Sequence, residues 1–140
     1  MGTTRLWFTM AALGFALAVG GCASGKQTIR MTANASIPAA QGTIKYSVTD
    51  NGNTAIELVV RHLAVPEQVA PGATTYVAWA RAPGDSAPQN LGALRVDKDL
   101  SGTLKTVTPL QSFDLYITAE PSPTAATPTN SELLTASIQR

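Results

Sequence analysis

The chain has 140 residues, with ten Lys and Arg, nine Asp and Glu, and a formal net charge of +1. This length has room for one domain, and it is large enough to bury a core without disulfides or metal ions. The balance of charges gives no overall electrostatic drive toward nucleic acid or an anionic lipid surface, so no nucleic-acid partner is expected. Charged residues are only 14% of the chain, which favours short strands and turns over long surface helices.

The first 21 residues have the features of a secretory signal. Arg5 supplies a basic start, and residues 6–19 form an uncharged, mostly apolar run. This run has 14 residues, whereas a helix needs about 20 to span the hydrocarbon. A cleaved signal is therefore favoured over a retained membrane helix.

The end of this leader carries a more specific pattern. Val19-Gly20-Gly21-Cys22 resembles the bacterial lipobox, which implies cleavage between Gly21 and Cys22 and attachment of a diacylglyceryl group to the Cys22 thiol. Cys22 is the chain's single cysteine and has no disulfide partner within it. The alternative is an incidental Cys22 with an ordinary signal peptidase cutting nearby. Ala23 stands where an aspartate often retains lipoproteins at the inner membrane, which implies the outer membrane, facing the periplasm, in a Gram-negative cell.

The lipobox divides the chain into three parts. We expect a signal peptide at 1–21, a lipidated N-terminus and short linker at 22–27, and one domain at 28–140. Two or more acyl chains anchor a protein stably, because each buried methylene contributes about 0.8 kcal/mol. The expected partner is the membrane through this anchor, and an envelope protein is a further candidate partner.

The domain is predicted to consist of short strands, because apolar and polar residues alternate with a period of two. In chain order, the strands are expected at 28–37, 43–48, 56 to about 62, 74–81, 89–96, 103–107, 113–118 and 134–138. Asp50-Asn51-Gly52-Asn53 predicts a type I′ hairpin turn. Prolines predict a loop without regular structure at 65–72, and a proline- and threonine-rich loop is expected at 120–130.

Two of these strands have distinctive sequences. The strand at 74–81 is apolar on both faces, with Tyr76 on one and Trp79 on the other, so it is predicted to lie centrally in a sheet. Core packing is the ordinary role of such aromatic residues, and the alternative is a stacking platform for sugars or peptides. Gly92, inside the next strand, predicts a bulge or a close backbone approach.

The number and spacing of the strands indicate the fold class. About 7–8 short strands without a helical period predict an all-β, immunoglobulin-like β-sandwich with Greek-key connections. A small β-barrel is the alternative.

Four motifs in the second half of the chain share one resemblance. They are Tyr76-Val77-Ala78-Trp79, Ala82-Pro83-Gly84, Asn90-Leu91-Gly92-Ala93-Leu94, and the run from Phe113 to Pro121. This set resembles the C-terminal extracytoplasmic domain of anti-sigma-K-type factors. The resemblance implies an all-β domain and an accessory or sensor role, without direct binding to a cytoplasmic sigma factor.

Two groups of residues are candidates for chemistry. Asp97, Asp99 and Ser101 match the first half of a calcium loop, but Thr108 stands where such a loop needs a bidentate carboxylate. His62 is the only histidine, so a Ser-His-Asp triad would have to use it. No G-x-S-x-G elbow accompanies it, and its register with Ile56 predicts a partly buried structural histidine.

No catalytic residue and no cofactor are therefore expected. The expected function is a non-enzymatic binding or structural module of the cell envelope, anchored by lipid. The alternatives are the accessory or sensor domain, and a weak calcium-binding domain or hydrolase that uses Asp97 and Asp99 or His62.

Overall fold

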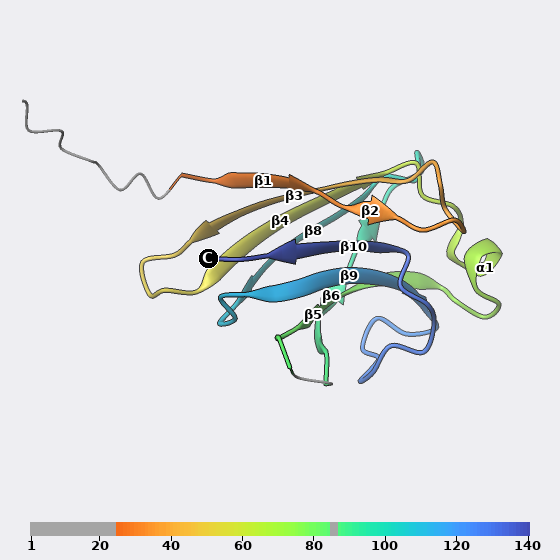
Figure 1. Ribbon diagram of the computed structural model, residues 1–140. Coiled ribbons are helices and arrows are strands. Elements are labelled where there is room, and N and C mark those ends of the chain that lie inside the picture. Colours follow the sequence, from red (N-terminus) through yellow and green to blue (C-terminus); the bar gives the residue numbers. More distant parts are fainter. Residues whose placement is uncertain (1–24, 85–86) are drawn as a thin grey trace, which may run out of the picture.

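The computed structural model describes residues 25–84 and 87–140, which form two antiparallel five-stranded sheets (Figure 1). Sheet A has the strand order β1-β3-β4-β8-β7, and sheet B has the order β2-β10-β9-β5-β6. The predicted signal peptide, its cleavage site and Cys22 lie outside the described residues.

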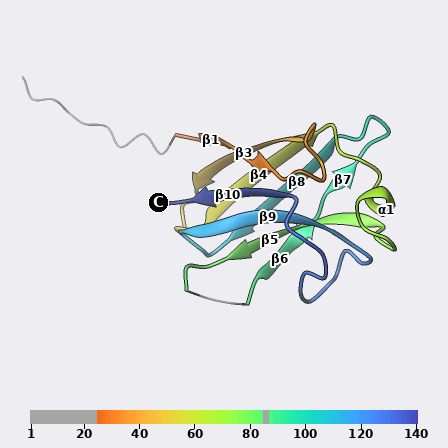
Figure 2. The same cartoon turned by 45° about the vertical axis from the view of Figure 1, so that its right-hand side comes forward.

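The strands of sheet A are β1 (Gln27–Arg30), β3 (Gln41–Val48), β4 (Thr54–Arg61), β7 (Arg95–Val96) and β8 (Gly102–Thr108). Those of sheet B are β2 (Thr32–Ala33), β5 (Thr75–Arg81), β6 (Gln89–Ala93), β9 (Phe113–Glu120) and β10 (Leu134–Ile138). The helix α1 (Pro66–Val69) lies at one end of the two layers (Figure 2). The all-β sandwich expected from the sequence is therefore the observed fold class.

Two stretches that were predicted as single strands are each divided between the sheets. The stretch 28–37 forms β1, which pairs with β3, and β2, which pairs with β10. The stretch 89–96 likewise forms β6 in one sheet and β7 in the other. The described residues therefore contain ten strands, more than the 7–8 predicted. One extended segment can serve both layers because the two sheets lie face to face.

The space between the sheets holds the hydrophobic core. Ile44, Leu58 and Val60 from sheet A are fully buried, and so are the inward residues of β9, such as Leu115. The alternation in 43–48 and 56–61 thus predicted the inward face correctly for these residues. Val48 occupies an inward register position opposite the buried Thr54, as predicted, but it is 45% exposed at the end of β3.

Two loop predictions were wrong in their geometry. The hairpin at 49–53 is not a two-residue type I′ turn, which needs two residues with positive φ. Thr49 N–H donates to Asn53 O, Gly52 N–H donates to Thr49 O, and Gly52 has a φ of +80° while Asn51 has none that is positive. This is a three-residue loop with one left-handed position. The region 65–72 contains α1, because a proline at the first helical position loses no hydrogen bond.

The predictions for β5 and Gly92 are confirmed. β5 is an interior strand, paired with β9 on one side and β6 on the other. The pairing of β5 with β6 shifts register between Ala78 and Trp79, and Gly92 has a φ of +125° at this bulge. Glycine adopts this conformation without strain, because it has no Cβ.

Gly42 in β3 packs against Met31, where the chain switches sheets, and Gly42→Ala is expected to lower the free energy of unfolding by about 1–3 kcal/mol. A Cβ at this position would lie 2.8 Å from Met31 Sδ and 2.9 Å from Met31 Cβ. Met31 Cβ is fixed to the backbone between β1 and β2, so the strand itself would have to move. Urea denaturation measures the change.

Ser47→Ala, on the outer face of the same strand, is the control and should change stability by less than about 0.5 kcal/mol. A Gly42→Ala variant as stable as this control would show that the sheet switch is loosely packed.

Candidate functional site

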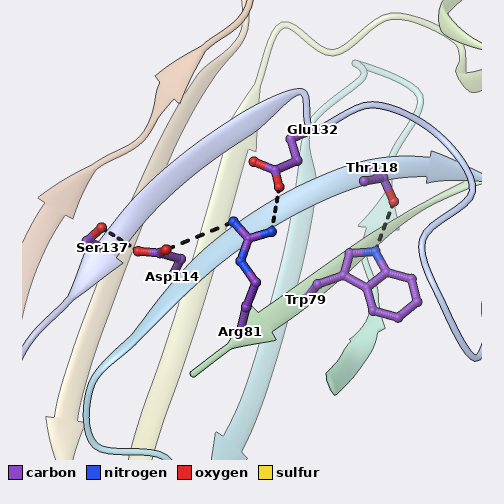
Figure 3. A network of polar contacts seen from close by, with 6 residues as sticks. All are labelled: Trp79, Arg81, Asp114, Thr118, Glu132 and Ser137. Carbon is purple, nitrogen blue, oxygen red and sulfur yellow. Dashed lines mark hydrogen bonds and ion pairs between the residues drawn. The ribbon is translucent and has the colours of Figure 1, made fainter. Parts of the chain in front are cut away.

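The outer face of sheet B carries a group of polar side chains that we call the Arg81 cluster: Arg81, Asp114, Glu132 and Ser137 (Figure 3). Arg81 ends β5 and is paired across the sheet with Asp114 of β9, which is paired in turn with Ser137 of β10. Glu132 comes from the loop that precedes β10. The alternation of the three strands turns these side chains away from the core.

Hydrogen bonds and ion pairs connect this cluster. Arg81 Nη1 lies 3.0 Å from Glu132 Oε1, and Arg81 Nη2 lies 4.0 Å from Asp114 Oδ2. Ser137 Oγ donates to Asp114 Oδ1 over 2.6 Å. The hydrogen bond with Glu132 raises the pKa of Arg81. Because all these side chains are partly exposed, the ion pairs contribute little to stability.

The cluster surrounds a surface depression of about 390 Å³. The guanidinium carbon of Arg81 lies 4.9 Å from the centre of the Tyr116 ring, so a cation–π contact also holds the arginine in place. The depression is lined by Thr32, Arg81, Asp114, Tyr116, Glu132, Thr135, Ala136 and Ser137. It offers a fixed cation, carboxylate oxygens and hydroxyl groups to a small polar ligand.

The hydrogen-bond partner of the Ser137 hydroxyl is a carboxylate. Ser137 Oγ donates a hydrogen bond to Asp114, and no imidazole lines the depression.

A second polar network on the same face runs from Trp79 to Glu120. Trp79 Nε1 donates to Thr118 Oγ1 over 2.9 Å, and Thr118 Oγ1 donates to Glu120 Oε1 over 2.5 Å. Thr129 donates to the same carboxylate from its backbone N–H, at 3.0 Å, and from its hydroxyl, at 2.5 Å. Glu120 is 0% exposed, and both oxygens of its buried carboxylate accept hydrogen bonds from these donors.

The charge state of Glu120 follows from these donors. Burial by itself raises the pKa of the carboxyl, but the hydrogen bonds from Thr118 and Thr129 outweigh it and hold the pKa below its ordinary value. The ionised Glu120 thereby fastens the segment 121–132, which also bonds through Asn130 Nδ2 to Ala119 O at 2.6 Å.

The aromatic residues of β5 do not form a stacking platform. Trp79 and Tyr76 are both 0% exposed. Trp79 packs on the outer face with Val77, Tyr116 and Ala125 of the fastened segment. Tyr76 faces the core, its hydroxyl donates to Ala64 O over 2.7 Å, and burial raises its pKa to about 12. Both side chains are therefore structural.

The calcium candidates form a turn between β7 and β8. Asp97 Oδ1 accepts hydrogen bonds from the backbone N–H groups of Asp99, at 2.9 Å, and Ser101, at 3.0 Å. Leu100 occupies the left-handed position of this turn, with a φ of 56°. Over residues 25–84 and 87–140, no group of three or more His, Cys, Asp or Glu could hold a metal ion. The Asp97 carboxylate acts as a cap for this turn.

His62 is exposed, so the prediction of a partly buried histidine was wrong. β4 ends at Arg61, and His62 has a left-handed φ of 57°, which breaks the alternation of the strand. Leu63 is then buried, and its N–H donates to Leu100 O. His62 does not line the depression beside Arg81.

Sequence reasoning did not single out Arg81, Asp114, Glu132, Ser137 or Glu120. Arg81 and Asp114 stand at outward positions of their strands, which is a readable signal, but their pairing depends on strand neighbours that the alternation does not specify. Cys22 and Gly21 lie outside the described residues, so the lipidation and cleavage site stays a prediction from the sequence.

Within the part of the chain that the structure describes, no helix is long and apolar enough to cross a bilayer. No protein-family model matches the chain, and no curated protein matches it significantly.

Proposed function

We propose that this chain is a lipid-anchored protein of the cell envelope whose β-sandwich is a non-enzymatic binding or structural module. The observation that carries the proposal is the lipobox placed directly before the sandwich. β1 begins at Gln27, so only four residues separate Cys22 from the first strand. Four extended residues span at most about 14 Å, so an anchor at Cys22 would keep the domain against the membrane surface. In a Gram-negative cell, Ala23 favours the outer membrane.

The Arg81 cluster supports a binding role. Glu132 and Asp114 hold the guanidinium of Arg81 in one orientation, and their side chains remain partly exposed. A ligand that carries both a donor and an acceptor can add to these groups without the loss of the existing ion pairs. Preorganised polar groups of this kind reduce the ordering that binding requires.

Cys22→Ser tests the anchor. The substitution removes the thiol that is acylated, so we expect the protein to move from the membrane fraction to the soluble fraction of cells. Ser24→Ala leaves the lipobox intact and is the control, which should stay with the membrane. If Cys22→Ser remains in the membrane fraction and resists extraction by salt and alkali, the lipid anchor is ruled out.

An accessory or sensor domain related to the outer domains of anti-sigma-K-type factors is a second candidate. The motifs that carry this resemblance fall on β5, β6 and β9, which are neighbours in sheet B, and on the turn after β5. The discriminating observation is the gene neighbourhood. A position beside a sigma-factor gene supports this role, and a position far from any signalling gene counts against it.

A further inference from the structure

Positive charge is gathered on the outer face of sheet A, the side turned away from sheet B. Six of the nine Lys and Arg in the described ranges lie there, whereas only one of the eight Asp and Glu does, Glu57. The six are Lys26, Arg30, Lys45, Arg61, Arg95 and Lys105. This face therefore carries a net charge of +5, six cations less one carboxylate, although the chain's formal net charge is only +1.

Strand register brings these cations together. Lys45 is paired with Glu57, and Glu57 with Lys105, in a row across β3, β4 and β8. Their neighbours Ile44 and Leu58 are fully buried, so this row points to solvent. The other cations occupy outward positions of the same sheet, through the pairs Arg30 with Thr43, Arg61 with Gln41, and Arg95 with Thr103.

Little on this face neutralises the charge. Lys105 Nζ lies 3.9 Å from Glu57 Oε1, and the Lys105 side chain is still 80% exposed. All six cations are exposed to solvent. A flat array of this kind attracts an anionic surface more strongly than the same charges scattered over a sphere, because all of them approach the surface together.

The face also has a depression of about 380 Å³ that suits a lipid headgroup. Lys26, Lys45 and Lys105 line it together with Glu57 and with Val107, which is 55% exposed. Three ammonium groups against one carboxylate leave the depression with a net positive charge beside an exposed apolar side chain, which suits a phosphate ester next to hydrocarbon.

The path of the chain indicates which surface this face meets. β1, the first strand in the chain, is an edge strand of sheet A (Figure 1). Lys26 directly precedes β1 and lines the depression. An anchor at Cys22 would therefore bring sheet A, rather than the Arg81 cluster of sheet B, next to the headgroups.

We propose that the outer face of sheet A docks onto anionic phospholipid headgroups and holds the anchored sandwich flat against the membrane. The Arg81 cluster on the opposite face then points away from the lipid, where it can meet a soluble ligand or an envelope protein. This inference rests on the proposed lipid anchor for its geometry, and on the charge and register of sheet A for its chemistry.

The test measures how fast each lysine side chain reacts with an added acetylating reagent, and mass spectrometry identifies the modified lysines. The protein, purified with detergent from the cells that produce it, is mixed with vesicles of phosphatidylcholine alone, or of phosphatidylcholine with phosphatidylglycerol. On the anionic vesicles we expect Lys26, Lys45 and Lys105 to react several times more slowly, and high salt to remove this protection. Lys98, in the turn between β7 and β8, is the internal control and should react equally on both.

A matched pair of variants measures the contribution of one cation. Lys45→Gln should weaken docking about fivefold, because it removes one cation near an anionic surface. Lys98→Gln removes the same charge from the turn and should leave docking unchanged. Equal effects of the two substitutions would overturn the proposed face.

The outcomes separate docking from anchoring. Flotation with both kinds of vesicle, with lysine protection only on the anionic ones, supports both proposals. Flotation with both and no difference in protection overturns docking and leaves the anchor. Flotation with anionic vesicles alone, reversed by salt, supports docking and overturns the anchor, and flotation with neither overturns both. Protection by a soluble polyanion, in the absence of protection by anionic vesicles, would overturn lipid as the occupant.

Discussion

Glu120→Gln is expected to lower the free energy of unfolding by about 2–3 kcal/mol at neutral pH. Every group around the carboxylate is a donor: Trp79 acts through Thr118, and Thr129 donates from both its backbone and its hydroxyl. Glutamine keeps one oxygen and replaces the other with a donor, so one of these bonds is lost and the rest lose the assistance of the charge. Glu120→Ala, which leaves the donors buried without an acceptor, should cost more.

The pH dependence identifies the ionised form as the cause. The folded-state pKa of Glu120 lies below its ordinary value of 4.5, so its contribution to stability is fully present above that value. This contribution is lost as the pH falls from about 4.5 through the lower folded-state pKa. The difference in stability between the native chain and Glu120→Gln should therefore shrink over this window.

Urea denaturation at a series of pH values measures both effects. Glu67→Gln, in the exposed first turn of α1, is the matched control and should leave stability within about 0.5 kcal/mol of the native chain. If Glu120→Gln lowers the free energy of unfolding by the same amount at about pH 3 as at about pH 7, the role of the charge is contradicted.

Trp79→Ala is expected to lower the free energy of unfolding by about 3–5 kcal/mol. Trp79 is fully buried, but it lies on the outer face of sheet B, where the segment 121–132 covers it. Its removal leaves a cavity beneath that segment and takes away the N–H that orients the Thr118 hydroxyl toward Glu120. Trp79→Phe keeps much of the packing and should cost less.

Hydrogen exchange of the peptide 121–132 distinguishes this mechanism from general loss of stability. In Trp79→Ala we expect this segment to exchange faster than the strands between the sheets, because its cover of the outer face is lost first. Val48→Ala removes a side chain that is 45% exposed and should change neither stability nor exchange appreciably. Uniformly faster exchange across the sandwich would argue against a local role of Trp79.

The sequence predicted the strands well where one face of a strand meets the core. Ile56, Leu58 and Val60 recur every second residue, and all three are buried against sheet B. The bulge at Gly92 was also readable, because glycine inside a strand marks a backbone that other residues avoid. The hairpin at 49–53 was placed correctly, but its turn type depends on which residue takes the left-handed position.

The candidate site was much less accessible to sequence reasoning. The alternation places Arg81 and Asp114 on outward positions but does not say that β5 and β9 are neighbours. Glu120 reads as the beginning of a polar loop, whereas it is buried, because Thr129 of that same loop folds back onto its carboxylate. Such contacts join residues whose separation along the chain carries no periodic signal.

By itself, the sequence determined that the domain is all-β, where most of its strands run and which of their residues face the core, because a period of two is imposed by the backbone of each strand. It also predicts a lipid anchor at Cys22, through a local motif that needs no fold. Only the tertiary structure decided that Trp79 is buried from the outside and that six cations share the outer face of sheet A. Both features depend on strand order and register, which neither the period of two nor the net charge of the chain specifies.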